Sequence, residues 1–408
     1  MYLDFAATSP ISKIWIDSII DSNAKGLFGN PGSYHEAGFN ALELMENSTK
    51  EILQDIFEDK ETAAKYDICY NSGSTESINQ FLYAYSKQPK TLVIYENVAH
   101  KAVLKSVERY FHKNSFMLQY NLTLDDNLEQ FKETLNNISK DKYENFVLVL
   151  TSVNNETGGM WKEQLVKELD IAVKEYKDTV WSHNKEIVLF LDHTQGFMKH
   201  NDNLQLADAF CFSAHKIGGM KGFGGLVYKK EVESILKANP LIVGGYEIRG
   251  GTKDPISVKA LAELVDHKYI RRIIDGDKIE DLYDNVQFKL REIAKDYNIP
   301  LSFNHYSDLY GKQSPYIINA SFIGIEGESL MSTLMNDCIS TGSACNSSEL
   351  KTSHVLMGIG VTKLTANCAF RISLSEDVNQ EELDDFLDNR FRPAIKFLAR
   401  MRTRHGEE

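Results

Sequence analysis

Lys216 lies in the stretch FCFSAHKIGGMKGFGGLVYKK, which runs from Phe210 to Lys230. An apolar run precedes this lysine and a glycine-rich turn follows it, so the amine is expected at the end of a strand. The ends of strands are where α/β enzymes place their reactive groups. Because the pKa of a desolvated lysine amine falls, Lys216 can be a nucleophile that forms a Schiff base with a carbonyl.

Polar side chains also follow the other apolar runs of this part of the chain. After YDICY, the segment NSGSTES brings Ser74 and Thr75 to a predicted helix start, where backbone N–H groups and hydroxyls can bind a phosphate. The remaining groups, in chain order, are His100, Asn155, Asp192, Gln195, Ser213 and His215. Each alone has an ordinary explanation, as a helix cap, a loop residue or a structural histidine.

Taken together, these groups predict a binding pocket for pyridoxal phosphate. Such a pocket needs a lysine for the aldehyde, a carboxylate for the pyridinium nitrogen and a small-residue turn for the phosphate. Lys216, Asp192 and the turn at Ser74 have the required chemistry. Packing alone does not explain why all of them follow strands.

The elements that must position these groups are short β-rich runs that alternate with helix-compatible segments. The runs are residues 66–70, 91–95, 145–151, 187–192, 208–213 and 223–229. Several are apolar on both faces, as expected of strands that helices cover on both sides. The alternation predicts an α/β fold with a mostly parallel sheet.

The length of the chain and a change in its secondary-structure pattern predict two domains. A chain of 408 residues exceeds what one hydrophobic core usually serves. After about residue 255, a long charged helical segment leads into shorter strands. We predict a large cofactor-binding domain of residues 15–255 and a smaller α+β domain of residues 1–14 and 256–408.

Composition narrows the possible partners and the compartment. The net charge of −13 argues against direct binding to nucleic-acid phosphates or to anionic membranes. No apolar run is long enough to span a bilayer, and MYLDFAATSP lacks the features of a signal peptide. The five cysteines form no CxxC motif, so we expect a cytoplasmic protein with free thiols and no metal site.

In chain order, the motifs resemble those of the cysteine desulfurases, which are class V aminotransferases of pyridoxal-phosphate fold type I. The matching segments are YLDFAAT, FGNPGSYH, NSGSTES, HKAVL, VNNETG, LDHTQ, FSAHKIGGMKGFG, RGGT, GESL, STGSACNSS and FRISLS. The resemblance covers nearly the whole chain. STGSACNSS is similar to the loop of the housekeeping and nitrogenase-type group.

The resemblance implies a role for each strand-end group. Lys216 would carry the cofactor and move the substrate α-proton, and His100 would lie over the ring and act in acid–base steps. Asp192 would pair with the ring nitrogen, Gln195 would donate to the phenolic oxygen, and Asn155 would lie beside ring and substrate. The groups expected to hold the phosphate are Ser74, Thr75, Ser213 and His215.

The resemblance also implies the substrate and the partners. Arg371, in FRISL, would bind the carboxylate of L-cysteine, a task that suits a planar bidentate donor. The thiolate of Cys345 would take the sulfur as a persulfide, release L-alanine and pass the sulfur to an acceptor protein. Thr252, in RGGT, would reach the phosphate of the neighbouring subunit of a homodimer.

Three departures from the family pattern accompany the resemblance. The run before RGGT is shorter than usual, His193 replaces a small residue after Asp192, and IGGM after Lys216 lacks the usual aromatic residue and proline. None of them removes a group that the chemistry needs. Cys345 lies among small polar residues, whereas the remaining four cysteines, Cys69, Cys211, Cys338 and Cys368, are expected in the core.

Other functions on the same fold stay open from the sequence. A selenocysteine lyase or an aminotransferase would share the cofactor site, but an aminotransferase has no need of Cys345. A non-catalytic scaffold that binds a sulfur carrier would need neither Lys216 nor Asp192. The acceptor of the sulfur could belong to iron–sulfur cluster assembly, tRNA thiolation or DNA phosphorothioation.

Overall fold

The computed structural model divides the chain into two compact units. Unit 1 comprises Met1–Ala7, Asn154–Met160 and Ile274–Glu408, and unit 2 comprises Thr8–Val153 and Trp161–Ile273. Residues 8–14 and 256–273 thus fall in unit 2, and residues 154–160 in unit 1. The residues that the structure describes are 1–112, 114–118, 132–133, 143–161, 166–169, 171–172, 175, 187–201, 203–245, 247–274, 276–305, 311–341 and 352–405.

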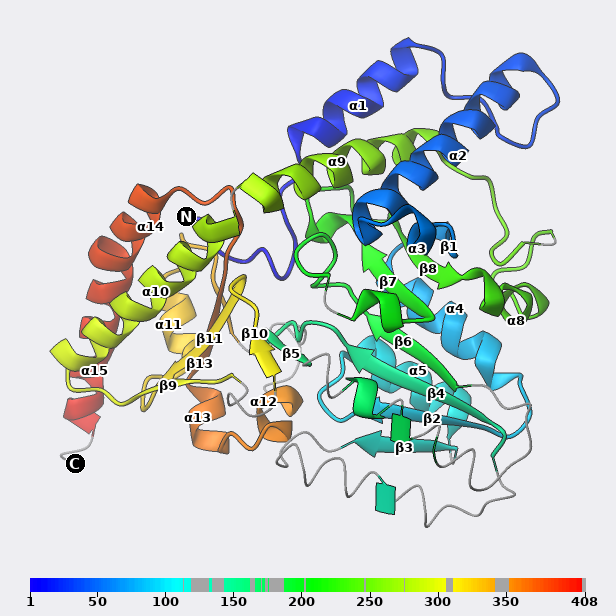
Figure 1. Ribbon diagram of the computed structural model, residues 1–408. Coiled ribbons are helices and arrows are strands. Elements are labelled where there is room, and N and C mark those ends of the chain that lie inside the picture. Colours follow the sequence, from blue (N-terminus) through cyan, green and yellow to red (C-terminus); the bar gives the residue numbers. More distant parts are fainter. Residues whose placement is uncertain are drawn as a thin grey trace. The chain divides into compact units, whose positions relative to one another are not determined.

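Unit 2 contains a seven-stranded sheet in the order β1-β8-β7-β6-β4-β2-β3 (Figure 1). Strand β8 is antiparallel to both of its neighbours, and the other strands run parallel to one another. This confirms the predicted α/β class with a mostly parallel sheet. The strands are β1 (Tyr66–Asn71), β2 (Thr91–Glu96), β3 (Ser115–Leu118), β4 (Asn145–Thr151), β6 (Ile187–Asp192), β7 (Ala209–Ser213) and β8 (Gly224–Lys229).

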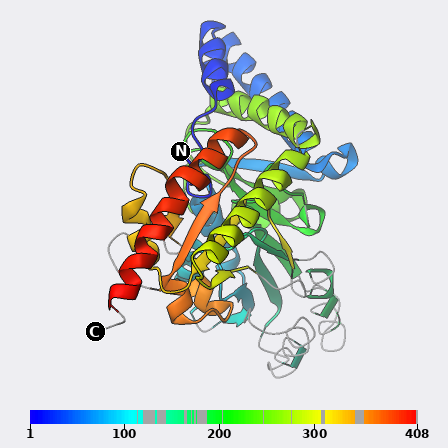
Figure 2. The same cartoon turned by 90° about the vertical axis from the view of Figure 1, so that its left-hand side faces the viewer.

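The helices of unit 2 pack on this sheet and on one another. A core cluster joins Phe81 of α4 and Val103 of α5 to Val147 and Phe190 of the sheet, all of them fully buried. Helices α1, α2 and α9 lie side by side in both views (Figures 1 and 2). The helices are α1 (Lys13–Ala24), α2 (Glu36–Phe57), α3 (Lys60–Ala63), α4 (Ser74–Ser86), α5 (Lys101–Phe111), α8 (Glu233–Ala238) and α9 (Pro255–Ile274), with short 3₁₀ turns at η1 (Leu204–Leu206), η2 (Ala214–Lys216) and η3 (Lys230–Val232).

Unit 1 is built on a four-stranded antiparallel sheet in the order β12-β13-β11-β9, and β10 pairs with β5. Figure 2 shows α10 and α15 side by side, and Arg392 of α15 is paired with Asp296 of α10. The strands are β5 (Gly159–Trp161), β9 (Leu301–Phe303), β10 (Gly311–Gln313), β11 (Ile317–Phe322), β12 (Ser340–Thr341) and β13 (Ala369–Ser373). The helices are α10 (Gly276–Asp296), α11 (Gly327–Thr333), α12 (His354–Gly358), α13 (Lys363–Asn367), α14 (Gln380–Phe386), the π-helical η4 (Leu387–Phe391) and α15 (Arg392–His405).

The first residues of the chain complete the sheet of unit 1. The N–H of Leu3 donates to the carbonyl of Cys338 at 2.8 Å, and the carbonyl of Leu3 accepts from the N–H of Ser373 at 2.8 Å. Leu3 is fully buried. Segments from both ends of the sequence therefore share one core.

The topology of unit 2 fixes where its polar loops lie. Because β1, β2, β4, β6 and β7 run parallel, their carboxyl ends meet at one edge of the sheet. The loops that carry Ser74, His100, Asp192 and Ser213 all leave from that edge. In the described part of the chain, no helix combines the length and the apolar character needed to cross a membrane.

Candidate active site

The start of α4 forms a cradle suited to a phosphate. Ser213 at the end of β7 accepts from the N–H of Ser74 at 2.8 Å, and its hydroxyl donates to Ser74 Oγ at 3.0 Å. Within the described residues, the N–H of Thr75 has no acceptor, as is usual for the first turn of a helix. An amide donor without an acceptor, at the positive end of a helix and beside two hydroxyl groups, favours an anion there.

Two glycines leave room for this cradle. Gly73 has φ of 130°, and a Cβ there would lie 2.8 Å from Ser213 Oγ. A Cβ on Gly224 of β8 would lie 2.6 Å from the Cα of Gly73, which is a backbone atom that cannot rotate away. The close approach of β8 to the turn after β1 therefore requires glycine on both segments.

His215 adds a neutral donor to the same loop. Burial, with the charges of Lys216 and Lys221, lowers the pKa of His215 to about 4. Its Nδ1 lies 3.1 Å from Thr8 Oγ1. The imidazole is therefore uncharged at neutral pH, and it can form a hydrogen bond without a charge of its own.

Residues at the start of unit 2 hold the turn that carries Lys216. The Ser9 hydroxyl donates to the Lys216 carbonyl at 2.9 Å, and the N–H of Ser12 donates to the Gly218 carbonyl at 2.7 Å. A Cβ on Gly219 would lie 2.6 Å from Ala214 Cβ and 2.9 Å from the ring of Trp15. The backbone of the lysine turn is thus fixed from outside by this segment.

Asp192 at the end of β6 has one carboxylate oxygen satisfied by the protein. Oδ1 accepts from the N–H of Thr194 at 3.2 Å, from the Thr194 hydroxyl, and from the thiol of Cys211 at 3.5 Å. No donor from the described residues reaches Oδ2, although Asp192 is only 4% exposed. Because a buried carboxylate oxygen needs a partner, Oδ2 fits a cationic donor from a ligand.

Burial keeps Cys211 a thiol, since it raises the pKa of that group well above its usual value together with the charge of Asp192. Cys211 lies in the core, as expected, but it also donates to Asp192. Thr194 and Cys211 were missed from the sequence. The short spacing of Asp192 and Thr194 is an ordinary turn pattern, and nothing local in the sequence relates Cys211 to Asp192.

The unusual His193 has a packing role. Its ring is 1% exposed, its Nδ1 lies 2.8 Å from Ser152 Oγ, and it meets the ring of Phe210 edge-on at 5.5 Å. A Cβ on Gly196 would lie 2.5 Å from its Cε1. The bulky histidine is accommodated because a glycine lies beside it. The adjacent Gln195 is buried as well, at 4% exposed.

His100 caps α5. Its Nδ1 accepts from the N–H of Ala102 at 3.1 Å. When the ring is neutral, this bond leaves the proton on Nε2. His100 therefore presents Nε2 as the atom that can donate a proton.

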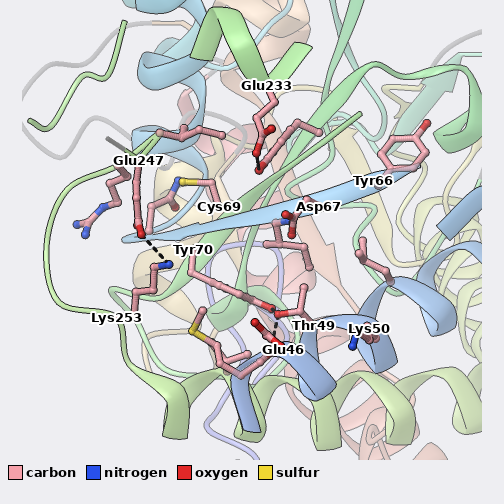
Figure 3. A pocket seen from close by; sticks show the side chains of 18 of the residues that line it. Glu46, Thr49, Lys50, Tyr66, Asp67, Cys69, Tyr70, Glu233, Glu247 and Lys253 are labelled. Carbon is pink, nitrogen blue, oxygen red and sulfur yellow. Dashed lines mark hydrogen bonds and ion pairs between the residues drawn. The ribbon is translucent and has the colours of Figure 1, made fainter. Parts of the chain in front are cut away.

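Thr252 lines a separate cavity of unit 2. A cavity of about 870 Å³ runs along β1, and Thr252 and Cys69 are among the residues that line it. Figure 3 shows Tyr70 bonded to Thr49 on one side of this cavity and the ion pair of Glu247 with Lys253 on the other. The Thr252 side chain is exposed and, in the described part of the chain, it contacts none of the phosphate-cradle groups by a hydrogen bond.

The loop that bears Thr252 is anchored beside the cradle. Arg249 Nε donates to Glu76 Oε1 of the first turn of α4 at 2.6 Å. The N–H of Gly250 donates to the carbonyl of Ile242 at 2.8 Å. The RGGT segment, which follows a shortened run, therefore keeps a fixed connection to α4.

Arg371 and Asn155 come together in unit 1. The guanidinium, 4% exposed, donates through Nη1 to the Asn155 carbonyl at 2.7 Å and through Nη2 to Ser340 Oγ at 3.1 Å and to Asp4. Its Nε is buried and has no partner among the described residues. A buried cationic donor without an acceptor suits a ligand carboxylate.

Cys345 lies outside the described residues, so its predicted role stays a prediction. Among the other cysteines, Cys211 and Cys368 are buried as expected, and Cys69 is half-buried. The expectation for Cys338 was wrong, because this thiol is exposed. Cys338 immediately precedes the buried Ile339 near β12, and a short strand at an edge leaves alternate side chains in solvent.

Comparison with known proteins gives a consistent result. The model of the family described as aminotransferase class V matches residues 1–386. A cysteine desulfurase IscS of Buchnera aphidicola subsp. Schizaphis graminum is 31% identical over 94% of this chain and 90% of its own. The mitochondrial cysteine desulfurase of Saccharomyces cerevisiae is 28% identical over 98% of this chain and 76% of its own.

The fold also resembles solved structures. A NifS-like protein from Rickettsia africae has a TM-score of 0.78 at 21% identity, with 97% of this chain and 99% of that chain covered. A structure described as SspA in complex with cysteine has a TM-score of 0.65 at 21% identity, covering 91% and 98%. At this identity the likeness concerns the fold.

Proposed function

This chain belongs to the class V aminotransferase family, among the cysteine desulfurases, and we propose that it converts L-cysteine to L-alanine and carries the sulfur on Cys345. The observation that carries the proposal is Asp192: its Oδ1 accepts from Thr194 and Cys211, while no donor of the described residues reaches Oδ2, which suits a cationic donor from a ligand. A nearby anion cradle at α4 and an amine at Lys216 complete the set of groups that pyridoxal phosphate needs.

The residues of unit 2 would hold the cofactor as follows. Ser74, Thr75 and Ser213, with neutral His215, bind its phosphate through hydroxyl, amide and imidazole donors. Asp192 Oδ2 accepts from the ring nitrogen, and Gln195 donates to the phenolic oxygen. When bound, the cofactor supplies an electron sink for the substrate Cα.

Proton movement falls to two side chains. The Lys216 amine would hold the cofactor, and in the reaction it would take up the α-proton of the substrate. His100 gives or takes a proton at Nε2, because its Nδ1 accepts the capping bond from Ala102. Asn155 and Arg371 bind the substrate, with the guanidinium on the carboxylate.

The sulfur leaves by attack of the Cys345 thiolate. A sulfur–sulfur bond forms, the carbon–sulfur bond of the substrate breaks, and its electron pair returns to carbon, which is then protonated to give L-alanine. The persulfide passes to an acceptor protein of iron–sulfur cluster assembly, tRNA thiolation or DNA phosphorothioation. The cytoplasm is the proposed site of this reaction.

We also infer a homodimer in which Thr252 reaches the phosphate site of the partner subunit. Large apolar side chains at the surface of unit 2 support an interface: Tyr34 is 96% exposed and Val243 is 80% exposed. Thr252 is itself exposed and its loop is anchored to α4 by Arg249. Sedimentation at micromolar concentration should show a species of twice 46.3 kDa; a fully active monomer would reject the interface.

Mass spectrometry after addition of L-cysteine without reductant tests the function. The peptide that holds Cys345 should gain one sulfur atom, and Cys345→Ser should bind the cofactor but release neither L-alanine nor sulfide. The exposed Cys338 provides a matched control, because Cys338→Ser should keep both products. A gain confined to Cys338, or L-alanine release by Cys345→Ser at the wild-type rate, would refute the proposal. Release from selenocysteine alone would favour a selenocysteine lyase.

A further inference from the structure

Glu96 is a buried carboxyl group to which the reaction above gives no role. It ends β2 and is 1% exposed. Its Oε2 accepts from the N–H of Thr151 at 2.9 Å, and its Oε1 accepts from the indole N–H of Trp161. Fully buried carboxyl groups are rare, and they are commonly paired or functional.

The sheet register relates Glu96 to Asp192. Tyr95 of β2 pairs with Val149 of β4, and Thr151 of β4 pairs with Asp192 of β6. Glu96, Thr151 and Asp192 therefore end three adjacent parallel strands. With strands about 4.8 Å apart, the backbones of β2 and β6 are separated by roughly 10 Å across β4. By this register Glu96 lies level with Leu191, one residue before Asp192.

The bonds of β4 extend this relationship. Glu96 holds the N–H of Thr151, and the next residue, Ser152, donates its N–H to the Asp192 carbonyl at 3.0 Å. Ser152 Oγ also lies 2.8 Å from His193 Nδ1. The end of β4 is thus bonded to Glu96 on one side and to the Asp192 segment on the other.

Charge couples the two groups as well. Burial raises the pKa of Glu96 to about 7, the bonds from Thr151 and Trp161 lower it, and the charge of Asp192 raises it. Asp192 on β6 is the charged group that acts on it across β4. Two other titratable groups follow these strands: His193 comes directly after Asp192, and His100 comes four residues after Glu96. Trp161 of β5, which also contacts Glu96, carries no charge.

We propose that Glu96 is a positioning residue that acts on the cofactor's ring nitrogen through Asp192. This inference rests on the proposed function. Glu96 fixes the end of β4 beside Asp192, and in its ionised form it supplies a second negative charge behind that carboxylate. A cation bonded to Asp192 offsets the repulsion between the two carboxyl groups, so cofactor binding expels a proton from Glu96.

Calorimetry of the apoprotein with pyridoxal phosphate tests this proton release. Titrations at pH 6.5 in two buffers of different ionisation enthalpy give the number of protons exchanged on binding. Wild type should release up to about one proton more than Glu96→Gln, because a group with a pKa near 7 is mostly protonated at this pH. Trp161→Phe is the matched control, since it removes the indole donor and keeps the carboxyl. Because loss of that bond raises the pKa of Glu96, this variant should release at least as much as wild type.

A spectroscopic measurement gives an independent readout. The visible absorbance of the bound cofactor should change with pH at a midpoint about one unit lower in Glu96→Gln than in wild type, since a removed anion makes nearby cations more acidic. Equal midpoints and equal proton release in wild type and Glu96→Gln would overturn the inference. If the midpoint shifted by the same amount in Trp161→Phe, Glu96 would have only a structural role.

If Glu96→Gln fails to fold, the wild-type protein alone can test whether Glu96 loses a proton when the cofactor binds. A carbon-13 titration of the glutamate carboxyls should find one that titrates near pH 7 in apoprotein and lower in holoprotein. The absence of such a carboxyl would reject the inference. Failure of the wild type to bind pyridoxal phosphate at all would instead reject the proposed function.

Discussion

The guanidinium of Arg371 donates to the carboxylate of Asp4 at 2.7 Å within unit 1. Arg371 is 4% exposed and the Asp4 side chain 23%, so little solvent screens the pair. The residue expected to bind the substrate carboxylate already holds a carboxylate of its own chain. Nη1 and Nη2 are engaged, and Nε is the donor that has no partner among the described residues.

We expect Asp4→Asn to strengthen the binding of L-cysteine. The substitution removes the anion that competes for Arg371, so KM should fall about 3- to 10-fold while kcat changes little. The protein should also lose about 1–3 kcal/mol of stability, because a buried cation loses its partner. Steady-state kinetics and denaturant unfolding measure both effects. Ser340→Ala, which removes a neutral partner of the same nitrogen, is the control, and a higher KM in Asp4→Asn would show that Asp4 only orients Arg371.

Asp192→Asn should slow the removal of the α-proton by at least about 100-fold, or roughly 3 kcal/mol of barrier lowering. An amide cannot balance the charge of a protonated ring nitrogen. Cys211→Ala removes one donor to Oδ1 and keeps the anion, so it should cost no more than about tenfold. The measurement is exchange of the α-hydrogen with solvent, followed by NMR. If Asp192→Asn exchanged the α-hydrogen at the wild-type rate, Asp192 would serve only to cap its turn.

His215 should make the apoprotein less stable in mild acid. The pKa of its imidazole is about 4 in the folded protein against 6.5 in the unfolded chain, mainly through burial. The unfolded chain binds the proton first, so stability is complete above pH 6.5 and is lost as pH falls towards 4, by up to about 1.4 kcal/mol per pH unit before solvent screening.

The difference between wild type and His215→Asn isolates this effect. Glu96 acts in the opposite direction, since its raised pKa of about 7 makes its contribution complete below pH 4.5 and lost as pH rises through 7. The dependence of wild-type stability on pH therefore contains the contributions of both His215 and Glu96. Urea unfolding from pH 4 to pH 7 should give a gap that narrows as the pH falls, and a constant gap would contradict the pKa of His215.

Gly219→Ala should weaken cofactor binding several-fold. The new Cβ would collide with Ala214 and Trp15, and the turn that carries Lys216 would shift to relieve the overlap. Equilibrium titration with pyridoxal phosphate, followed by absorbance, measures the effect. Gly276→Ala is the matched control, because nothing lies within 4 Å of its added Cβ. Equal affinities in the two variants would show that the lysine turn tolerates displacement.

Much of the fold of unit 2 is visible in the sequence because its strands are short, apolar and β-branched. The run 145–151 is β4 itself, and the run 187–192 is β6. The boundary between the two units, by contrast, lies at the end of α9, where unit 2 stops at Ile273 and unit 1 resumes at Ile274. Helical periodicity continues through this boundary, so it does not reveal where one unit stops.

The contacts of the candidate site are less predictable than its residue types. Lys216 and Asp192 follow strands, and that position signals their chemistry. The bond from Arg371 to Asp4 joins residues 367 positions apart, and the bond from Trp161 to Glu96 joins residues 65 apart. No local pattern encodes such pairs, because they depend on which strands become neighbours and in which register.

The position of Leu3 between Cys338 and Ser373 sets an order for folding during synthesis. Its two backbone partners lie more than three hundred residues downstream. At about 5–20 residues per second, a ribosome needs roughly 20–70 s to make the intervening chain. For that time the apolar Leu3 has no place in its own sheet, whereas the segments of unit 2 up to β8 have already been made. Translation rate and chaperones that shield the apolar segment around Leu3 should therefore govern the yield of this protein.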